Sequence, residues 1–158
     1  MAAPLIGQHG HMDAEPVELA AWECESLLRS QVVGRVGMTT PEGPSVLPVN
    51  YSVVDSVIWI RTAVDSQLGR VADGTVVALE IDGIDHGRHR GWSVLARGPA
   101  VRVADPEVVA HLERVWPPRP WASGDRPTYV GIRWRTLTGR KLGSSWDPRR
   151  ETEVSRTV

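Results

Sequence analysis

Six segments of this chain alternate apolar and polar residues with a period of two, the pattern of β-strands that bury one face. In the second of them, Leu47, Val49, Tyr51 and Val53 fall on the same face. Turn-forming residues separate several neighbours, for example at Pro41–Pro44. The predicted strands cover about residues 31–40, 45–54, 57–62, 75–82, 91–103 and 128–135. Six strands with short connections predict a mainly β fold, a small antiparallel barrel.

Three short helices are predicted at the periphery of this barrel. The first begins near Asp13–Pro16, because proline suits a first helical turn, and Cys24 then falls on its apolar stripe. Cys24 is therefore interpreted as a small core residue and not as a nucleophile. The others cover about Ser66–Ala72 and Pro106–Val115, the latter capped by Asp105.

Length and composition favour one globular domain. The chain has 158 residues and a net charge of -1, which gives no indication of a nucleic-acid partner. No apolar run approaches the roughly 18 residues of a membrane span. A single cysteine is consistent with a cytoplasmic protein. We expect an N-terminal tail over residues 1–12, which holds His9 and His11, a barrel domain over 13–142 and a C-terminal tail over 143–158.

One segment combines residue types that suit a phosphate group. A predicted strand ends in Arg61 and Thr62, and a predicted helix begins at Ser66. Arginine can pair with a phosphate, hydroxyls can donate hydrogen bonds to it, and helix N-termini attract anions. The alternative is an ordinary strand-end arginine beside a capped helix, and the residue types leave both open.

Other polar clusters have two interpretations each. Asp82, Asp85, His86 and His89 form either a solvated hairpin loop or a metal or acid–base site. Arg133, Arg135 and Arg140 form either a solvated strand face or a face for an anionic ligand. The motifs of serine hydrolases, zinc proteases and nucleotide-binding loops do not occur.

The order of several short segments resembles the pyridoxamine 5'-phosphate oxidase-like, flavin-binding split-barrel family. The resemblance covers about residues 17–142. It is carried by Gly34-Arg35-Val36-Gly37, Pro48-Val49-Asn50-Tyr51, Ile60-Arg61-Thr62, Val77-Ala78-Leu79-Glu80-Ile81-Asp82, Gly91-Trp92-Ser93-Val94, Gly98-Pro99-Ala100, Pro120-Trp121-Ala122, Ile132-Arg133 and Thr138-Gly139-Arg140.

The resemblance implies a six-stranded antiparallel split barrel that forms a homodimer, with FMN in a cleft between the subunits. The backbone of Pro48, Val49, Asn50 and Tyr51 would lie along the flavin ring. Arg61, Thr62, Ser66 and Gln67 would face the phosphate, and Trp92 and Ser93 would come from a strand near the same cleft, as part of the other subunit. The family often has a lysine where Gln67 stands in this chain.

The resemblance implies an FMN-dependent oxidoreductase acting on a small molecule. A flavin supplies the redox chemistry itself, which explains why the sequence shows no catalytic triad. Two alternatives stay open: a deazaflavin-dependent reductase on the same fold, and a non-enzymatic carrier or sensor of flavin or haem. In the haem alternative, His86, His89 or His111 would supply an axial nitrogen. Trp92 and Trp121 fit either core and interface packing or the edge of a cofactor.

Overall fold

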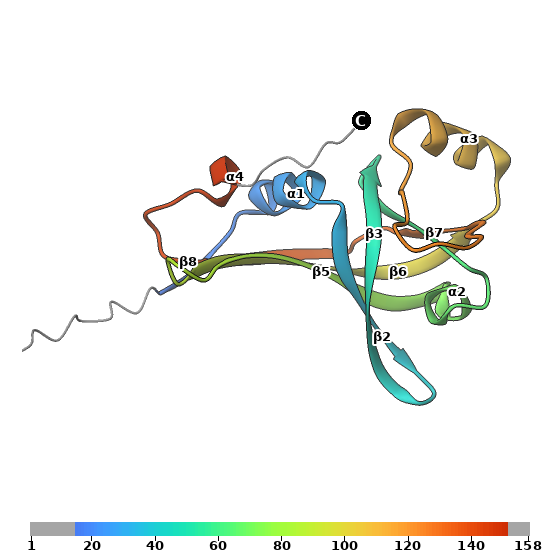
Figure 1. Ribbon diagram of the computed structural model, residues 1–158, viewed down its shortest axis with the longest axis horizontal. Coiled ribbons are helices and arrows are strands. Elements are labelled where there is room, and N and C mark those ends of the chain that lie inside the picture. The colour runs from blue at the N-terminus through green and yellow to red at the C-terminus, as the bar shows by residue number, and fades with distance from the viewer. Residues whose placement is uncertain (1–14, 152–158) are drawn as a thin grey trace, which may run out of the picture.

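Six antiparallel strands close into a barrel in the computed structural model of this chain, which describes residues 15–151 (Figure 1). The strands follow one another around the barrel in the order β6-β5-β2-β3-β4-β7, and pairing between β6 and β7 closes it. The prediction of a mainly β, six-stranded antiparallel barrel is thus confirmed. The strands are β2 (Val33–Thr40), β3 (Gly43–Val54), β4 (Val57–Thr62), β5 (Asp73–Asp85), β6 (Arg90–Val103) and β7 (Thr128–Ile132).

Two further strands widen the sheet beyond the barrel. Strands β5 and β6 continue past the barrel as a long hairpin, where β8 (Thr136–Leu142) pairs with β6 and β1 (Pro16–Glu18) pairs with β8. The last predicted strand was too long, because the chain leaves β7 at Ile132 and starts β8 only at Thr136. The predicted helix start at Pro16 was also wrong. Residues 16–18 find hydrogen-bond partners on the edge of β8, a contact that helical periodicity cannot reveal.

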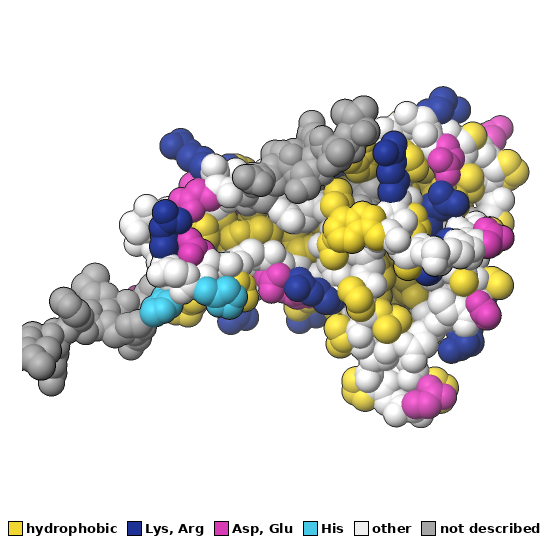
Figure 2. Space-filling model, viewed as in Figure 1, with side chains coloured by type: hydrophobic (Ala, Val, Ile, Leu, Met, Phe, Trp, Pro, Cys, Tyr) yellow, Lys and Arg dark blue, Asp and Glu magenta, His cyan; other side chains and the backbone are white. Residues whose placement is uncertain are grey.

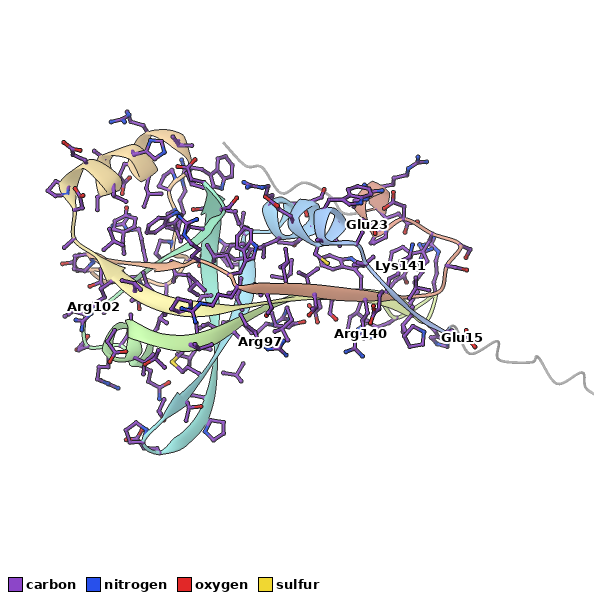
Figure 3. The ribbon with its side chains drawn as sticks, turned by 180° about the vertical axis from the view of Figure 1, so that it is seen from behind. Glu15, Glu23, Arg97, Arg102, Arg140 and Lys141 are labelled. Atoms are coloured by element: carbon purple, nitrogen blue, oxygen red, sulfur yellow. The ribbon has the colours of Figure 1, made fainter. Side chains whose placement is uncertain are left out.

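Helix α1 (Ala21–Ser30) covers one face of this widened sheet, and the short helix α4 (Pro148–Glu151) packs beside it (Figure 1). Cys24 on α1 is fully buried, and burial raises the pKa of its thiol, as expected for a core residue. The opposite face of the sheet carries no helix in the described part of the chain. Arg97 and Arg140 point away from α1 on that face (Figure 3).

Helix α3 (Pro106–Val115) lies against the outside of the barrel and forms a second apolar cluster with it. Its Leu112 is buried against Val57, Trp59 and Tyr129, which face outward from β4 and β7. The bounds of α3 and its Asp105 cap were both predicted correctly, since the Asp105 carboxylate accepts a hydrogen bond from the amide of Glu107. Helix α2 (Gln67–Val71) is a single turn between β4 and β5.

The termini fall partly outside the described residues. The predicted N-terminal tail over residues 1–12, with His9 and His11, lies outside them. Of the predicted C-terminal tail, residues 143–151 are described and include α4. Across residues 15–151, no helix is both long and apolar enough to cross a bilayer.

Candidate functional site

Two predicted site residues, Asn50 and Arg61, are neighbours on the outside of the barrel. Strands β3 and β4 pair Tyr51 with Ile60, and both of these side chains are buried in the core. Side chains alternate along a strand, so the residues adjacent to Tyr51 and Ile60 face outward. These are Asn50, which precedes Tyr51, and Arg61, which follows Ile60. The same alternation turns Pro48 outward and Val49 inward, so Val49 and Tyr51 can offer only their backbone to a ligand on this surface.

The side chain of Tyr51 has a structural role. Its hydroxyl donates a hydrogen bond to the carbonyl of Leu28, near the end of α1, at 2.7 Å. Burial raises the pKa of Tyr51 far above its ordinary value, so the phenol stays neutral. This bond ties α1 to the barrel directly behind the outward-facing Asn50.

Arg61 is half-exposed and makes three contacts within its own chain. Its Nη1 lies 3.7 Å from a Glu113 carboxylate oxygen, and its Nε donates to the carbonyl of Arg126 at 3.3 Å. The guanidinium carbon also lies 5.3 Å from the centre of the Tyr129 ring. An ion pair of this length and exposure is weak, so the Arg61 cation stays open to a stronger anion.

The three other residues predicted to face a phosphate are engaged with their own chain. The Thr62 hydroxyl donates to the Ser66 hydroxyl at 2.7 Å, and Ser66 in turn caps α2 by accepting from the Gly69 amide. The Gln67 side chain accepts from the Ser45 hydroxyl at 2.7 Å. The hydroxyls of Thr62 and Ser66 are thus already partnered, and of the four residues predicted to face a phosphate only Arg61 carries a positive charge.

A pocket of about 520 Å³ opens next to Asn50 and Tyr51, between β3 and the segment that follows α3. Two indole rings contribute to its walls: Trp116 is half-exposed and Trp121 is 75% exposed. The backbone amide of Trp121 donates to the Asn50 side chain at 2.8 Å, which fastens this segment to the barrel. Figure 2 shows hydrophobic side chains gathered over this part of β3. Arg114 and Arg119 also line the pocket, and so does Glu113, the ion-pair partner of Arg61. The pocket therefore offers aromatic surfaces and positive charge to a planar anionic ligand.

Trp92 and Ser93 lie at the opposite end of the long hairpin. The Tyr129 end of β7 pairs with Val103 of β6, whereas Trp92 pairs with Lys141 of β8. The 11 residue-to-residue steps from Trp92 to Val103 along β6 span about 35 Å. Trp92 is buried on the α1 side of the sheet, whereas the half-buried Ser93 faces the open side. A single chain therefore does not bring these two residues to Arg61.

The acidic and histidine cluster of this hairpin is held largely by arginines. Asp82 pairs with Arg35 at 2.7 Å, and Asp85 pairs with Arg88 at 3.0 Å, which lowers the pKa of Asp85. The His86 and His89 side chains are exposed. Among residues 15–151, no three His, Cys, Asp or Glu side chains gather in a way that could hold a metal ion.

The remaining polar residues considered from the sequence lie elsewhere. Nε2 of His111 lies 3.0 Å from the Asp55 carboxylate, in the groove between α3 and the turn that joins β3 to β4. Arg133, Arg135 and Arg140 are all exposed. None of these arginines lines the pocket beside Asn50.

Sequence reasoning missed the residues around Arg61 and the role of the segment after α3. Glu113, Arg126 and Tyr129 meet Arg61 only because α3 folds back over β4 and β7. No local pattern links positions so far apart in the chain. In the segment after α3, Trp121 had been considered for the edge of a cofactor, but its backbone bond to Asn50 and the contribution of Trp116 to the pocket were not predicted.

A protein-family model and one known protein each match most of the chain in sequence. A family model described as pyridoxamine 5'-phosphate oxidase matches residues 21–141. The uncharacterized protein Rv0080 of Mycobacterium tuberculosis is 38% identical over 133 residues, which are 81% of this chain and 86% of that protein.

Solved structures show the same fold. An FAD-binding protein from Mycobacterium smegmatis is 30% identical with a TM-score of 0.66, covering 79% of this chain and 97% of that one. An FAD- and haem-binding protein from the same organism shares the fold at 15% identity, with a TM-score of 0.63 over 82% of this chain and 75% of that one. With the family model spanning nearly the whole barrel, this chain belongs to the pyridoxamine 5'-phosphate oxidase-like family of flavin-binding split barrels.

Proposed function

We propose that this protein binds a flavin nucleotide at the outer surface of β3 and β4 and uses it to transfer electrons or hydride to a small molecule. The observation that carries the proposal is that Arg61 lies beside two residues that line the aromatic pocket, its strand neighbour Asn50 and its ion-pair partner Glu113. A half-exposed cation whose ion pair with Glu113 is as long as 3.7 Å suits a phosphate, and two indoles suit the ring system.

Within this site, each residue has a distinct expected task. Arg61 binds the phosphate, and Asn50 and the β3 backbone orient the ring. Trp121 shields the ring from water, since its indole is the most exposed large apolar side chain beside the pocket. When bound, a flavin supplies the redox chemistry, so the protein needs no catalytic triad of its own. FMN is the simplest ligand with this chemistry, and the FAD-binding relative makes FAD the second ligand to test.

We further propose that the working unit is a cytoplasmic homodimer. Trp92 and Ser93 lie about 35 Å along β6 from the Arg61 end, so they can contribute to the same site only from a second copy. Within the described residues, no helix covers the sheet face that carries Ser93 and Arg140, so a second copy could pack there (Figure 3).

The test of the flavin proposal is a titration of FMN and of riboflavin, which lacks the phosphate, followed by flavin fluorescence. The wild-type protein should bind FMN more tightly than riboflavin. Arg61→Ala should weaken FMN binding by about 1.5–3 kcal/mol, or roughly 10- to 150-fold, because it removes a charge-assisted pair. Riboflavin binding should change little.

The matched control is Arg102→Ala, which removes an exposed arginine of β6 whose charge acts on the exposed Asp73 carboxylate and not on Glu113. It should leave both affinities near wild type. Equal affinity of Arg61→Ala and the folded wild type for FMN would show that the phosphate does not lie at Arg61. An absorption spectrum of the purified protein then distinguishes flavin from haem.

A further inference from the structure

Glu113 is the acidic residue that approaches Arg61. Among residues 15–151, no other carboxylate comes within ion-pair distance of the Arg61 guanidinium. The pair joins two elements, since Arg61 lies near the end of β4 and Glu113 lies in the last turn of α3. Helix α3 is itself fixed to the barrel by the buried Leu112, the neighbour of Glu113 in the chain.

The Glu113 carboxylate is held in place by a second contact. The Tyr129 hydroxyl donates a hydrogen bond to the same oxygen that faces Arg61. Burial, with the bond to Glu113 as a second cause, raises the pKa of Tyr129 to about 12. The phenol therefore remains a hydrogen-bond donor at neutral pH, and the carboxylate cannot turn away from Arg61 without losing that bond.

We propose that Glu113 is a specificity-determining residue, an internal carboxylate that occupies the Arg61 guanidinium until a stronger anion displaces it. This inference rests on the proposed function, since it assumes that a flavin phosphate binds Arg61. A terminal phosphate carries a charge of about -1.5 to -2 and three acceptor oxygens, so it can outcompete one carboxylate oxygen at 3.7 Å. A singly charged carboxylate ligand holds no such advantage over Glu113.

Glu113 is expected to lower the affinity of the site for every ligand that binds Arg61 through a phosphate. The Glu113 charge remains near the phosphate after displacement, because α3 is anchored, and like charges at short range repel. Removing that charge while keeping the acceptor for Tyr129 should therefore strengthen phosphate binding. Glutamine does both, since its amide oxygen still accepts the Tyr129 hydrogen bond.

The experiment compares FMN and riboflavin binding by the wild type and by Glu113→Gln. The variant should bind FMN about two- to fivefold more tightly, the range expected for a half-exposed pair. Riboflavin affinity should stay unchanged, because riboflavin brings no competing anion. The gain should shrink in high salt, which screens exposed charges.

Two further variants isolate the effect. Glu107→Gln removes the same charge from the first turn of α3, away from Arg61, and should not change FMN affinity. In an Arg61→Ala background, Glu113→Gln should lose most of its effect, because the cation for which carboxylate and phosphate compete is gone. Thermal unfolding of each variant shows whether it is folded.

The outcomes separate this inference from the proposed function. If Arg61→Ala weakens FMN binding selectively but folded Glu113→Gln binds FMN no better than wild type, the role of Glu113 is wrong and the flavin site stands. If Arg61→Ala affects FMN and riboflavin alike, the phosphate is not at Arg61, and both are overturned. If Glu107→Gln increases FMN affinity as much as Glu113→Gln does, the inference is also overturned. The gain would then come from the change in the net charge of the protein and not from the position of Glu113.

Discussion

At the scale of single residues, the outward and inward faces of β3 have different tasks. Asn50 faces the pocket, whereas Tyr51 faces the core and bonds to the Leu28 carbonyl. Sequence reasoning treated Pro48–Tyr51 as one stretch along a flavin ring. The alternation of the strand divides it, so the Tyr51 side chain should matter for stability rather than for binding.

Tyr51→Phe tests this division. The variant removes a buried hydrogen bond without removing the ring, so the free energy of unfolding should fall by about 1–1.5 kcal/mol. Denaturant unfolding measures the loss, and FMN titration should show an unchanged affinity. A large loss of FMN binding by the folded variant would place the phenol in the binding site.

The raised pKa of Tyr51 also predicts that the protein becomes less stable at alkaline pH. A phenol whose pKa is raised on folding favours the native state below its unfolded value of about 10, and this contribution is lost as pH rises above it. The wild type should therefore lose stability in that alkaline range, by up to about 1.4 kcal/mol per pH unit for this group. Tyr51→Phe should show a shallower decline, measured by denaturant unfolding at several pH values.

At the scale of elements, the start of α1 shows a weak point. Its N-cap is Ala20, which has no side-chain acceptor for the exposed amides of the first turn. The Glu23 side chain reaches back to accept from the Ala20 amide at 2.8 Å, so half of a capping box is present.

Ala20→Ser should complete that box. The backbone of Ala20 is already extended, as an N-cap requires, and the residue is exposed, so a hydroxyl can be added without a clash. The free energy of unfolding should rise by about 0.5–1 kcal/mol. Ala20→Val is the matched control, because it adds bulk without an acceptor and should not stabilise α1. A melting temperature for Ala20→Ser at or below wild type would contradict this expectation.

At the scale of the whole molecule, the main question is whether residues near the two ends of the long β6 strand form one site across two copies of the chain. The Arg61 end and the Ser93 end are far apart in one chain, and a shared site needs two copies. Sedimentation at micromolar concentration should show a dimer, whose interface would bury on the order of 2,000 Å² or more if obligate. A monomer at that concentration would remove the shared site.

Mixing two defective variants tests the sharing directly. Arg61→Ala damages the phosphate end, and Ser93→Glu places a negative charge on the open sheet face. If each site takes residues from both subunits, refolding an equal mixture should restore about a quarter of the wild-type sites, because half of the dimers are mixed and each has one intact site. Normal FMN binding by Ser93→Glu alone would show that each subunit binds flavin on its own.

The sequence by itself determined the barrel strands, the cap and bounds of α3 and the burial of Cys24. These depend on local periodicity and capping chemistry, which operate over a few residues. Tertiary structure alone decided that Pro16–Glu18 is a strand, because its partners lie on β8 at the other end of the chain. It likewise decided that Glu113 and Tyr129 surround Arg61 and that Trp92 and Ser93 lie far from it. Such contacts join residues distant in the chain, and no short-range pattern encodes which strand edge or helix face will meet them.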